Sequence, residues 1–213
     1  MIRGSVRVAA AAVAAVGVVL AGCSSEDAPA DPAAPVPESL AASAATGDFA
    51  CEGVTEDTAR LVVGGDPEVV DRRRWAAGQE TADDTFSCRV IGREGELLLL
   101  VWGPETEIDL YDQTRDSLAQ PEVFPDQEPL DDAEYGIGYT RGESPTGDVD
   151  ARFSCTPEAD GGQFTITVTL YAGPPGRDAR ADAAAVVRSL VPYVCAGRPL
   201  PPGTLPEVQP DST

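Results

Sequence analysis

The amino-acid sequence predicts an α+β domain, an antiparallel sheet of about five strands with helices packed on one face. One basis for this prediction is the order of periodicities along the chain, which reads helix, two strands, helix, three strands, helix. The other is a repeat that divides the domain into two loosely similar halves. Phe86-Ser87-Cys88 recurs as Phe153-Ser154-Cys155, and each triplet precedes a glycine-containing turn, an apolar strand, a Gly-Pro break and a helix.

The first half is predicted to open with a helix. Thr55 is a helix-capping residue, the acidic pair 56–57 suits the positive end of the helix dipole, and the glycine pair 64–65 ends the helix. Asp66, directly before a proline, is a second capping signal, and it predicts a short helix toward Arg74.

A hairpin and a helix complete the first half. Residues 85–91 and 96–102 have strand composition and are separated by a turn with glycine at both ends. The run 97–101 is too continuously apolar for a half-exposed strand, so we expect it in the centre of the sheet. After a Gly-Pro break, four residues fall on one helical face before Pro121 stops the run: Ile108, Tyr111, Arg115 and Leu118.

The second half is predicted to contain three strands and a helix. Residues 135–140 and 149–153 have strand composition and are joined by a Ser-Pro-Thr-Gly turn. In residues 163–172 apolar side chains alternate with threonines, a two-residue period that predicts one buried face. The helix over residues 178–191 places small and branched apolar residues in line and ends shortly before Cys195.

The N-terminus has the layout of a bacterial export signal. Two arginines precede an apolar run, residues 8–20, which is shorter than the roughly 20 residues that a membrane-spanning helix needs. The run ends in Leu20-Ala21-Gly22-Cys23, which resembles the lipobox of bacterial lipoproteins. The resemblance implies that residues 1–22 are a signal peptide and that Cys23 carries a diacylglycerol with fatty acyl chains such as palmitate. The alternative is an ordinary secreted protein with an incidental cysteine.

Composition divides the rest of the chain into three parts. Residues 23–47 are rich in Ala, Pro, Ser, Asp and Glu and have almost nothing to bury, which predicts a disordered acidic tether. Residues 48–197 predict a single folded domain, and the proline-rich residues 198–213 predict a flexible tail. We therefore expect a monomer that its lipid holds at the extracytoplasmic face of the cell membrane.

The composition excludes much common chemistry. The chain has no His, Lys or Asn, so histidine bases and ligands, Schiff-base and P-loop lysines and Asn-linked glycans are absent. The formal charge is −21, and about −23 once the two arginines of the signal are removed, which opposes binding to nucleic acid or anionic lipid. We expect no cofactor and no metal.

Four cysteines follow the lipobox, and an even number in an exported domain predicts two disulfides: Cys51, Cys88, Cys155 and Cys195. Near-equal spacing favours pairing Cys51 with Cys88 and Cys155 with Cys195. Loop entropy does not decide, because the chain-entropy model gives about 4 kcal/mol for such a loop and only about 1 kcal/mol more for a Cys51–Cys195 loop. The alternative of a zinc site lacks the C-x-x-C spacing of zinc knuckles.

These features together resemble a family of uncharacterised actinobacterial lipoproteins that carries a domain of unknown function. The resemblance rests on the lipobox, the acidic tether, the segment Cys51-Glu52-Gly53-Val54-Thr55-Glu56 before a helix that ends in Gly64-Gly65, the strand cysteine Cys88, and a late cysteine after an alanine-rich helix. The chain is more distantly similar to extracellular sensor domains and to small mycobacterial lipoproteins with two disulfides on an α/β fold. Neither resemblance implies a catalytic activity.

Three consecutive arginines, Arg72, Arg73 and Arg74, are the only concentrated positive charge in this acidic chain. At a helix end, such a run can bind an anionic ligand such as a phosphate or carboxylate. The alternative is that the arginines complement the helix C-terminus and the surrounding acids.

Other candidate sites have an equally plain structural alternative. A proline-rich stretch contains four acids: Asp126, Glu128, Asp131 and Asp132. Clustered carboxylate oxygens can bind Ca²⁺. The alternative is that the four acids lie in a solvated loop. One predicted strand contains two tyrosines and two glycines: Tyr135, Gly136, Gly138 and Tyr139. Its glycines can leave one face of the strand without side chains, so that a flat group packs there. The alternative is that the glycines mark a bulge or a helix that lies close to the strand. Trp75 and Trp102 are predicted to lie in the core.

The sequence thus predicts a lipid-anchored envelope protein that binds an envelope protein or a small ligand and is not an enzyme. The alternative is a secreted hydrolase that uses carboxylates. A serine hydrolase is not favoured, because neither Ser87 nor Ser154 lies in a G-x-S-x-G motif. A buried, close pair of acids in a cleft would favour the hydrolase. A shallow apolar groove without such a pair would favour binding.

Overall fold

The computed structural model describes residues 48–74, 86–103, 110–132, 134–142, 147–159 and 163–208. The chain divides into two compact units, Met1–Asp31 and Pro32–Thr213, and all described residues belong to the second. Its elements are β1 (Phe49–Cys51), β2 (Val54–Thr55), α1 (Glu56–Val63), β3 (Glu68–Arg74), β4 (Phe86–Ile91), β5 (Gly95–Trp102), α2 (Leu110–Leu118), β6 (Gln127–Asp132), β7 (Gly136–Gly142), β8 (Val149–Cys155), β9 (Thr165–Ala172) and α3 (Ala179–Val194).

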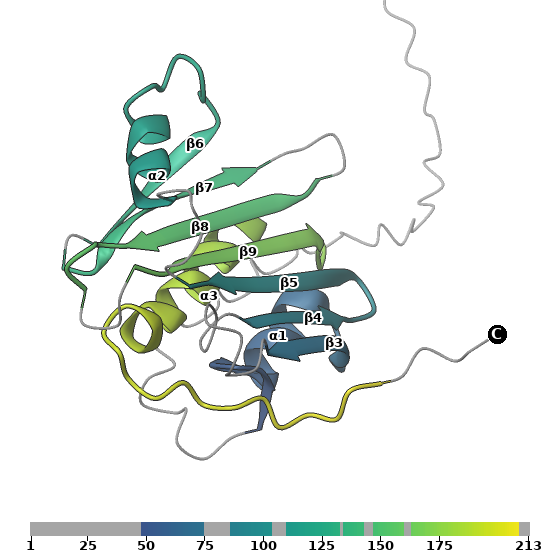
Figure 1. Cartoon of the computed structure of the whole chain (residues 1–213). Coiled ribbons are helices and arrows are strands. Elements are labelled where there is room, and N and C mark those ends of the chain that lie inside the picture. The colour runs from purple at the N-terminus through teal and green to yellow at the C-terminus, as the bar shows by residue number, and fades with distance from the viewer. Residues whose placement is uncertain are drawn as a thin grey trace, which may run out of the picture. The chain divides into compact units, whose positions relative to one another are not determined.

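The central feature is a seven-stranded sheet in the order β3-β4-β5-β9-β8-β7-β6, in which every neighbouring pair is antiparallel (Figure 1). The prediction of an α+β fold with an antiparallel sheet is confirmed. The predicted halves supply the two sides of the sheet, and they meet where β5 pairs with β9 along its whole length. The sheet has seven strands instead of about five because β3 and β6 add one strand at each edge.

The two edge strands are the elements that local signals predict incorrectly. The short helix expected after Asp66 is wrong: its residues form β3, in which β-branched Val69 and Val70 favour a strand and pairing with β4 overrides the capping signal. The loop expected around Asp126 is wrong from Gln127 onward, where β6 pairs with β7. Pro129 is tolerated there because an edge strand leaves the outward side of its backbone unpaired.

The helices lie on both faces of the sheet. α3 packs on β8 and β9, and α1 packs on β5 and also contacts α3, so these two helices share one face. The prediction that the helices pack on one face is wrong for α2. α2 lies on the opposite face, where the Thr114 hydroxyl is 3.0 Å from the Ser154 hydroxyl (Figure 1). Ser154 also lies 3.0 Å from the Thr165 hydroxyl, so buried polar side chains on this face hold α2 in place. We call the face under α1 and α3 the core face and the other the open face.

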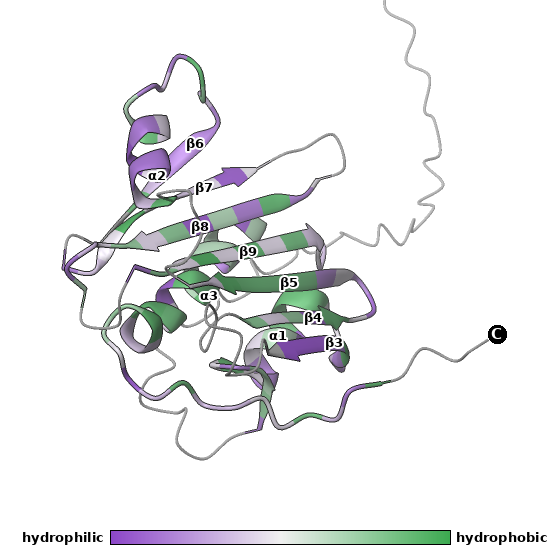
Figure 2. Cartoon of the chain, viewed as in Figure 1, coloured by the Kyte–Doolittle hydropathy of each residue, from purple (hydrophilic) through white to green (hydrophobic). Residues whose placement is uncertain are grey.

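The core face carries the hydrophobic core. Because side chains alternate along a strand, one set from β5 and one from β9 point toward α1 and α3 and are buried. These are Leu97, Leu99, Val101, Ile166, Val168 and Leu170. Each contributes about 1.5–3 kcal/mol through burial. Figure 2 shows hydrophobic colouring concentrated in β5 and α3, and hydrophilic colouring in the edge strands β3 and β6.

The ends of α1 are those that the sequence predicts. Thr55 caps the N-terminus, and its hydroxyl accepts a hydrogen bond of 3.2 Å from the Thr58 amide. Gly64 ends the helix with a φ of 70°, and its amide donates to the Arg60 carbonyl. A Cβ at Gly64 would lie 2.8 Å from the Cβ of Glu94, so the position also requires glycine for space.

The glycines of β7 do not leave a bare face. A Cβ at Gly136 would lie 2.1 Å from the Ser154 carbonyl oxygen, and one at Gly138 would lie 2.9 Å from the Phe153 ring. The hypothesis that a flat ligand packs there is therefore wrong. The glycines are needed because the neighbouring strand and the buried Phe153 ring approach the backbone closely.

Two disulfides join Cys51 to Cys88 and Cys155 to Cys195, which confirms the sequential pairing and excludes the zinc alternative. Each bond ties a segment beside a helix to a strand of the sheet. Cys51 ends β1, shortly before α1, and Cys195 directly follows α3. The four cysteines are fully buried.

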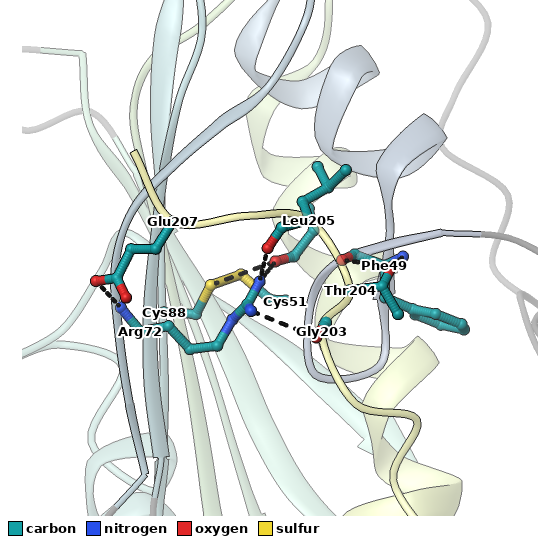
Figure 3. The surroundings of a disulfide bond; sticks show 9 residues. Phe49, Cys51, Arg72, Cys88, Gly203, Thr204, Leu205 and Glu207 are labelled. Atoms are coloured by element: carbon teal, nitrogen blue, oxygen red, sulfur yellow. Dashed lines mark hydrogen bonds between the residues drawn. A yellow bond between two sulfur atoms is a disulfide. The ribbon is translucent and has the colours of Figure 1, made fainter. Parts of the chain in front are cut away.

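Residues 198–208 are held against the domain, and we call them the C-terminal strap. The predicted flexible tail is therefore wrong for this part of 198–213, and residues 209–213 lie outside the described residues. The amides of Thr204 and Val208 donate to the carbonyls of Phe49 and Val69 at 2.8 and 2.7 Å. The Gly53 amide donates to the Pro201 carbonyl at 2.9 Å. The strap thus runs across β1 to the free edge of β3 (Figure 3).

The predicted signal peptide, lipobox and tether lie outside the described residues. Within the described part of the chain, no helix has the length and apolar character required to cross a membrane.

Candidate functional site

Of the three arginines proposed as an anion site, the two whose side chains are described, Arg72 and Arg73, do not act together. The Arg72 guanidinium donates to the carbonyls of Ala50, Gly203 and Leu205, at 2.5, 3.3 and 3.1 Å (Figure 3). Arg73 pairs with Asp71 at 3.0 Å and is 70% exposed, and the Arg74 side chain is outside the described part. Successive residues of a strand point to opposite faces, so β3 separates the Arg72 guanidinium from that of Arg73, which a helix end would have kept together.

Arg72 instead anchors the C-terminal strap, which gives a prediction. Arg72→Met keeps the aliphatic stem and removes three hydrogen bonds from a charged donor. We expect the free energy of unfolding to fall by about 1.5–3 kcal/mol, the range for hydrogen bonds to charged groups. Urea denaturation measures this loss, and hydrogen exchange should show faster exchange at the Thr204 and Leu205 amides.

Arg73→Met is the matched control, since it removes the same charge from the next residue of β3. Its exposed ion pair should contribute no more than about 0.5 kcal/mol. Equal losses of stability in the two variants would show that Arg72 does not anchor the strap.

Of the four acids considered for Ca²⁺, the two whose side chains are described, Asp126 and Glu128, do not form part of a cation site. Glu128 lies in β6 and pairs with Arg180 at 2.5 Å, while the side chains of Asp131 and Asp132 lie outside the described part. Among the residues that can be described, no group of three or more His, Cys, Asp or Glu side chains is arranged to hold a metal ion. Asp126 contributes to the pocket described below.

Trp102 is not a core residue. It ends β5 on the open face and is 38% exposed, because the alternation that buries Leu99 and Val101 turns Trp102 to the other side. Leu98 and Leu100 share this face and are half-buried. Trp75 lies outside the described residues.

Among the residues that the structure describes, a pocket of about 310 Å³ lies on the open face, at the end of the sheet away from α2. We call it the open-face pocket. Its walls come from the turn before β6 and from β7, β8 and β9: Asp126, Arg141, Gly142, Asp148, Asp150, Thr169 and Tyr171. It is polar, and so it differs from the shallow apolar groove that the sequence suggested for a binding module.

The floor of the open-face pocket is a row across three strands. Arg141, Asp150 and Thr169 are direct cross-strand partners on β7, β8 and β9. The Arg141 guanidinium donates to one Asp150 oxygen at 2.6 Å, and the Thr169 hydroxyl donates to the other at 2.8 Å. The hydrogen bond from Arg141 to the Asp150 carboxylate raises the pKa of Arg141.

Two acids and an aromatic ring surround this floor. Asp126 is exposed and adds attractive charge for Arg141, while Asp148 is half-buried beside the start of β8. Tyr171 stands 38% exposed near the end of β9, where it pairs with Glu96 of β5. The described lining therefore holds three carboxylates, one guanidinium, the hydroxyl of Thr169 and the phenol of Tyr171.

A second pocket of about 310 Å³ borders the loop after β9, residues 173–176. Its polar part is the ion pair between Arg177 and Asp182, whose side chains are only 6% and 4% exposed. Two bonds of 2.6 Å join the guanidinium to both carboxylate oxygens. Because Arg177 and Asp182 are buried and bonded to each other, the second pocket has fewer polar groups for a ligand than the open-face pocket has.

Sequence reasoning missed most of the open-face pocket. Arg141, Asp150 and Thr169 come from three strands, and no motif or spacing connects them. The signal for this site in the sequence was the row of threonines in residues 163–172. A strand with polar residues on one side does not bury that side in the core, so the side can contact solvent or a ligand. Comparisons with protein-family models, curated proteins and solved structures find no significant match to this chain.

Proposed function

We propose that the protein is a lipid-anchored protein of the cell envelope whose α+β domain binds a small ligand or a partner without transforming it. The lipobox ending in Cys23 supports the anchor, and the open-face pocket supports the binding. The single observation that carries the binding role is the charged row of Arg141 and Asp150, fixed on adjacent strands in a pocket of about 310 Å³. Ligand pockets begin at about 300 Å³, and a small number of placed polar groups fixes the orientation of the ligand in them.

The hydrogen bonds of the pocket favour binding over catalysis. Both oxygens of Asp150 are already bonded, one to Arg141 and one to Thr169, so this carboxylate is poorly placed to accept a proton from a substrate. Two other carboxylates in the described part are buried: that of Asp182 is bonded to Arg177, and that of Glu52 has one oxygen, Oε2, without a hydrogen-bond partner. Screens for esterase, phosphatase, peptidase and glycosidase activity should show no turnover. Turnover that disappears when one specific Asp or Glu is replaced would support the carboxylate-dependent hydrolase instead.

Cys23→Ala tests the anchor. We expect the variant to leave the membrane fraction for the medium or to remain uncleaved, because acyl chains contribute about 0.8 kcal/mol for each buried CH₂ group. Fractionation followed by intact-mass measurement distinguishes these two results from a lipidated, processed chain.

Ser24→Ala is the matched control, since it changes the next residue and keeps the lipobox cysteine. This variant should remain in the membrane fraction with the mass of the lipidated chain. A Cys23→Ala variant that stays membrane-bound and processed would contradict the proposal.

A further inference from the structure

The C-terminal strap is docked on the domain as an extended peptide docks on the edge of a sheet (Figure 3). Its main chain bonds to two segments that lie far away in the sequence. The Thr204 amide donates to the Phe49 carbonyl at 2.8 Å, and the Phe49 amide donates to the Thr204 hydroxyl at 2.8 Å. The Val208 amide donates to the Val69 carbonyl at 2.7 Å, on the outer edge of β3. Bonds of this kind depend on the path of the main chain more than on its side chains.

Little of the strap is buried. No residue from 198 to 208 is fully buried, and only Leu200 and Leu205 of these residues pack against the hydrophobic core. Segments with few buried apolar contacts open at a lower free energy than the core does, so the strap should open while the sheet stays folded. Its prolines keep the free chain extended, so less conformational freedom is lost when it docks again: Pro199, Pro201, Pro202 and Pro206.

The end of α3 allows the strap to open as a unit. α3 ends at Val194, and the Cys155–Cys195 disulfide holds the next residue to β8. Gly197 follows with a φ of 64° and is exposed, as are Arg198 and Pro199. The chain can therefore change direction at Gly197 while α3 stays in place.

Opening would leave unpaired polar groups on β1 and β3. The Arg72 guanidinium would lose two of its three acceptors, the carbonyls of Gly203 and Leu205. The carbonyls of Phe49 and Val69 would lose the donors that the strap supplies. An edge with unpaired N–H and C=O groups pairs readily with another extended chain.

We propose that the surface under the strap, formed by Phe49, Val69 and Arg72, is a docking site for an extended, proline-containing segment of a partner protein. The strap occupies this surface until the partner segment replaces it. The surface shares no residue with the described lining of the open-face pocket, so the proposal goes beyond the ligand role of that pocket.

The strap itself shows the chemistry of a segment that fits. The segment needs main-chain carbonyls within reach of Arg72 and apolar side chains at the positions of Leu200 and Leu205. Proline fits at positions 202 and 206, because none of the bonds described above uses the main-chain nitrogen of these positions. The partner segment is therefore extended and contains leucine-like residues separated by prolines.

Hydrogen exchange of the native full-length chain tests whether the strap opens by itself. The amides of Thr204, Leu205 and Val208 should exchange at least about 100-fold faster than the amides that pair β5 with β9, because the centre of the sheet opens only on global unfolding. The amide of Cys195, which donates to the Val191 carbonyl on the other side of Gly197, should stay protected. Equal protection of the strap and the sheet centre would overturn the proposal, because the strap would then be a fixed part of the fold.

A fluorescent peptide of residues 198–208 tests whether another segment can replace the strap. The full-length chain is given a protease site between Gly197 and Arg198, and binding is followed by fluorescence anisotropy. After cleavage the peptide should replace the severed strap and bind with saturation. Before cleavage it should bind at least about tenfold more weakly, because the attached strap competes at a high effective concentration.

Two substitutions identify the surface that the peptide occupies. Arg72→Met in the cleaved chain should lower the affinity about tenfold or more, whereas the matched control Arg73→Met should leave it unchanged. A Thr204→Val peptide leaves the domain unaltered and removes the hydroxyl bonded to Phe49, so it should bind about threefold to tenfold more weakly. Equal affinities of the two arginine variants, or no saturable binding to the cleaved chain, would overturn the proposal. These variants leave the open-face pocket unchanged, so failure of this proposal is distinguishable from failure of the ligand role proposed for that pocket.

Discussion

Asp182→Asn should lower the free energy of unfolding by about 3–5 kcal/mol, the cost of breaking a buried ion pair. The carboxylate of Asp182 accepts two hydrogen bonds from Arg177, each of 2.6 Å, and the two side chains are 4% and 6% exposed. An amide keeps the shape but loses the charge and can accept on one side only. The guanidinium of Arg177 would then remain buried without its counterion, and urea denaturation with intact disulfides should show the loss.

Asp57→Asn is the matched control. Asp57 also lies in the first turn of a helix, so its interaction with the helix dipole is comparable, and it also pairs with an arginine, Arg60. Its side chain, however, is 90% exposed, so this variant should lose no more than about 1 kcal/mol. A second comparison replaces both buried partners, by Arg177→Met with Asp182→Leu, and should recover much of the lost stability because no charge is left alone. If Asp182→Asn costs no more than Asp57→Asn, the buried pair does not have the role assigned to it.

Removing the Cys155–Cys195 disulfide should cost about 4 kcal/mol. The bond closes a loop of 40 residues, and the chain-entropy model relates the loss to the freedom that the unfolded chain regains. It also ties the end of α3 to β8, the strand against which α3 packs. Cys155→Ala with Cys195→Ala, compared with the native chain in urea denaturation, measures the effect.

The single variant Cys155→Ala separates the effect of losing the cross-link from the effect of removing side-chain volume on the free energy of unfolding. The cross-link is lost with the first substitution, so the single and double variants should lie within about 1 kcal/mol of each other. The Cys51–Cys88 disulfide closes a loop of nearly equal length, 37 residues. A second variant, Cys51→Ala with Cys88→Ala, should therefore lose about the same free energy of unfolding, but it should affect a different part of the domain. Because Ala50, next to Cys51, accepts a bond from Arg72, only this second variant should speed exchange at the amides of the C-terminal strap. A loss below about 1 kcal/mol would contradict the entropic account.

Short-range signals account for the parts of this fold that could be predicted. Thr55 and the glycine pair after Val63 set the ends of α1, because a cap depends on hydrogen bonds within a few residues. The alternation in β9 correctly indicated one buried face, and the hairpin of β4 and β5 followed from its turn. Cysteine spacing favoured the pairing that the structure has, although loop entropy alone did not distinguish the alternatives.

Contacts between distant residues decided the remainder. β3 is a strand because β4 pairs with it, α2 lies on the open face because Ser154 lies there, and residues 198–208 are held because Arg72 reaches their carbonyls. The open-face pocket likewise exists only once β7, β8 and β9 are in register, which places Arg141 beside Asp150 and Thr169. Local composition carries no information about register or about which face a side chain will share, because both depend on partners far along the chain. The elements of this protein were therefore largely readable from its residues, and its candidate site was not.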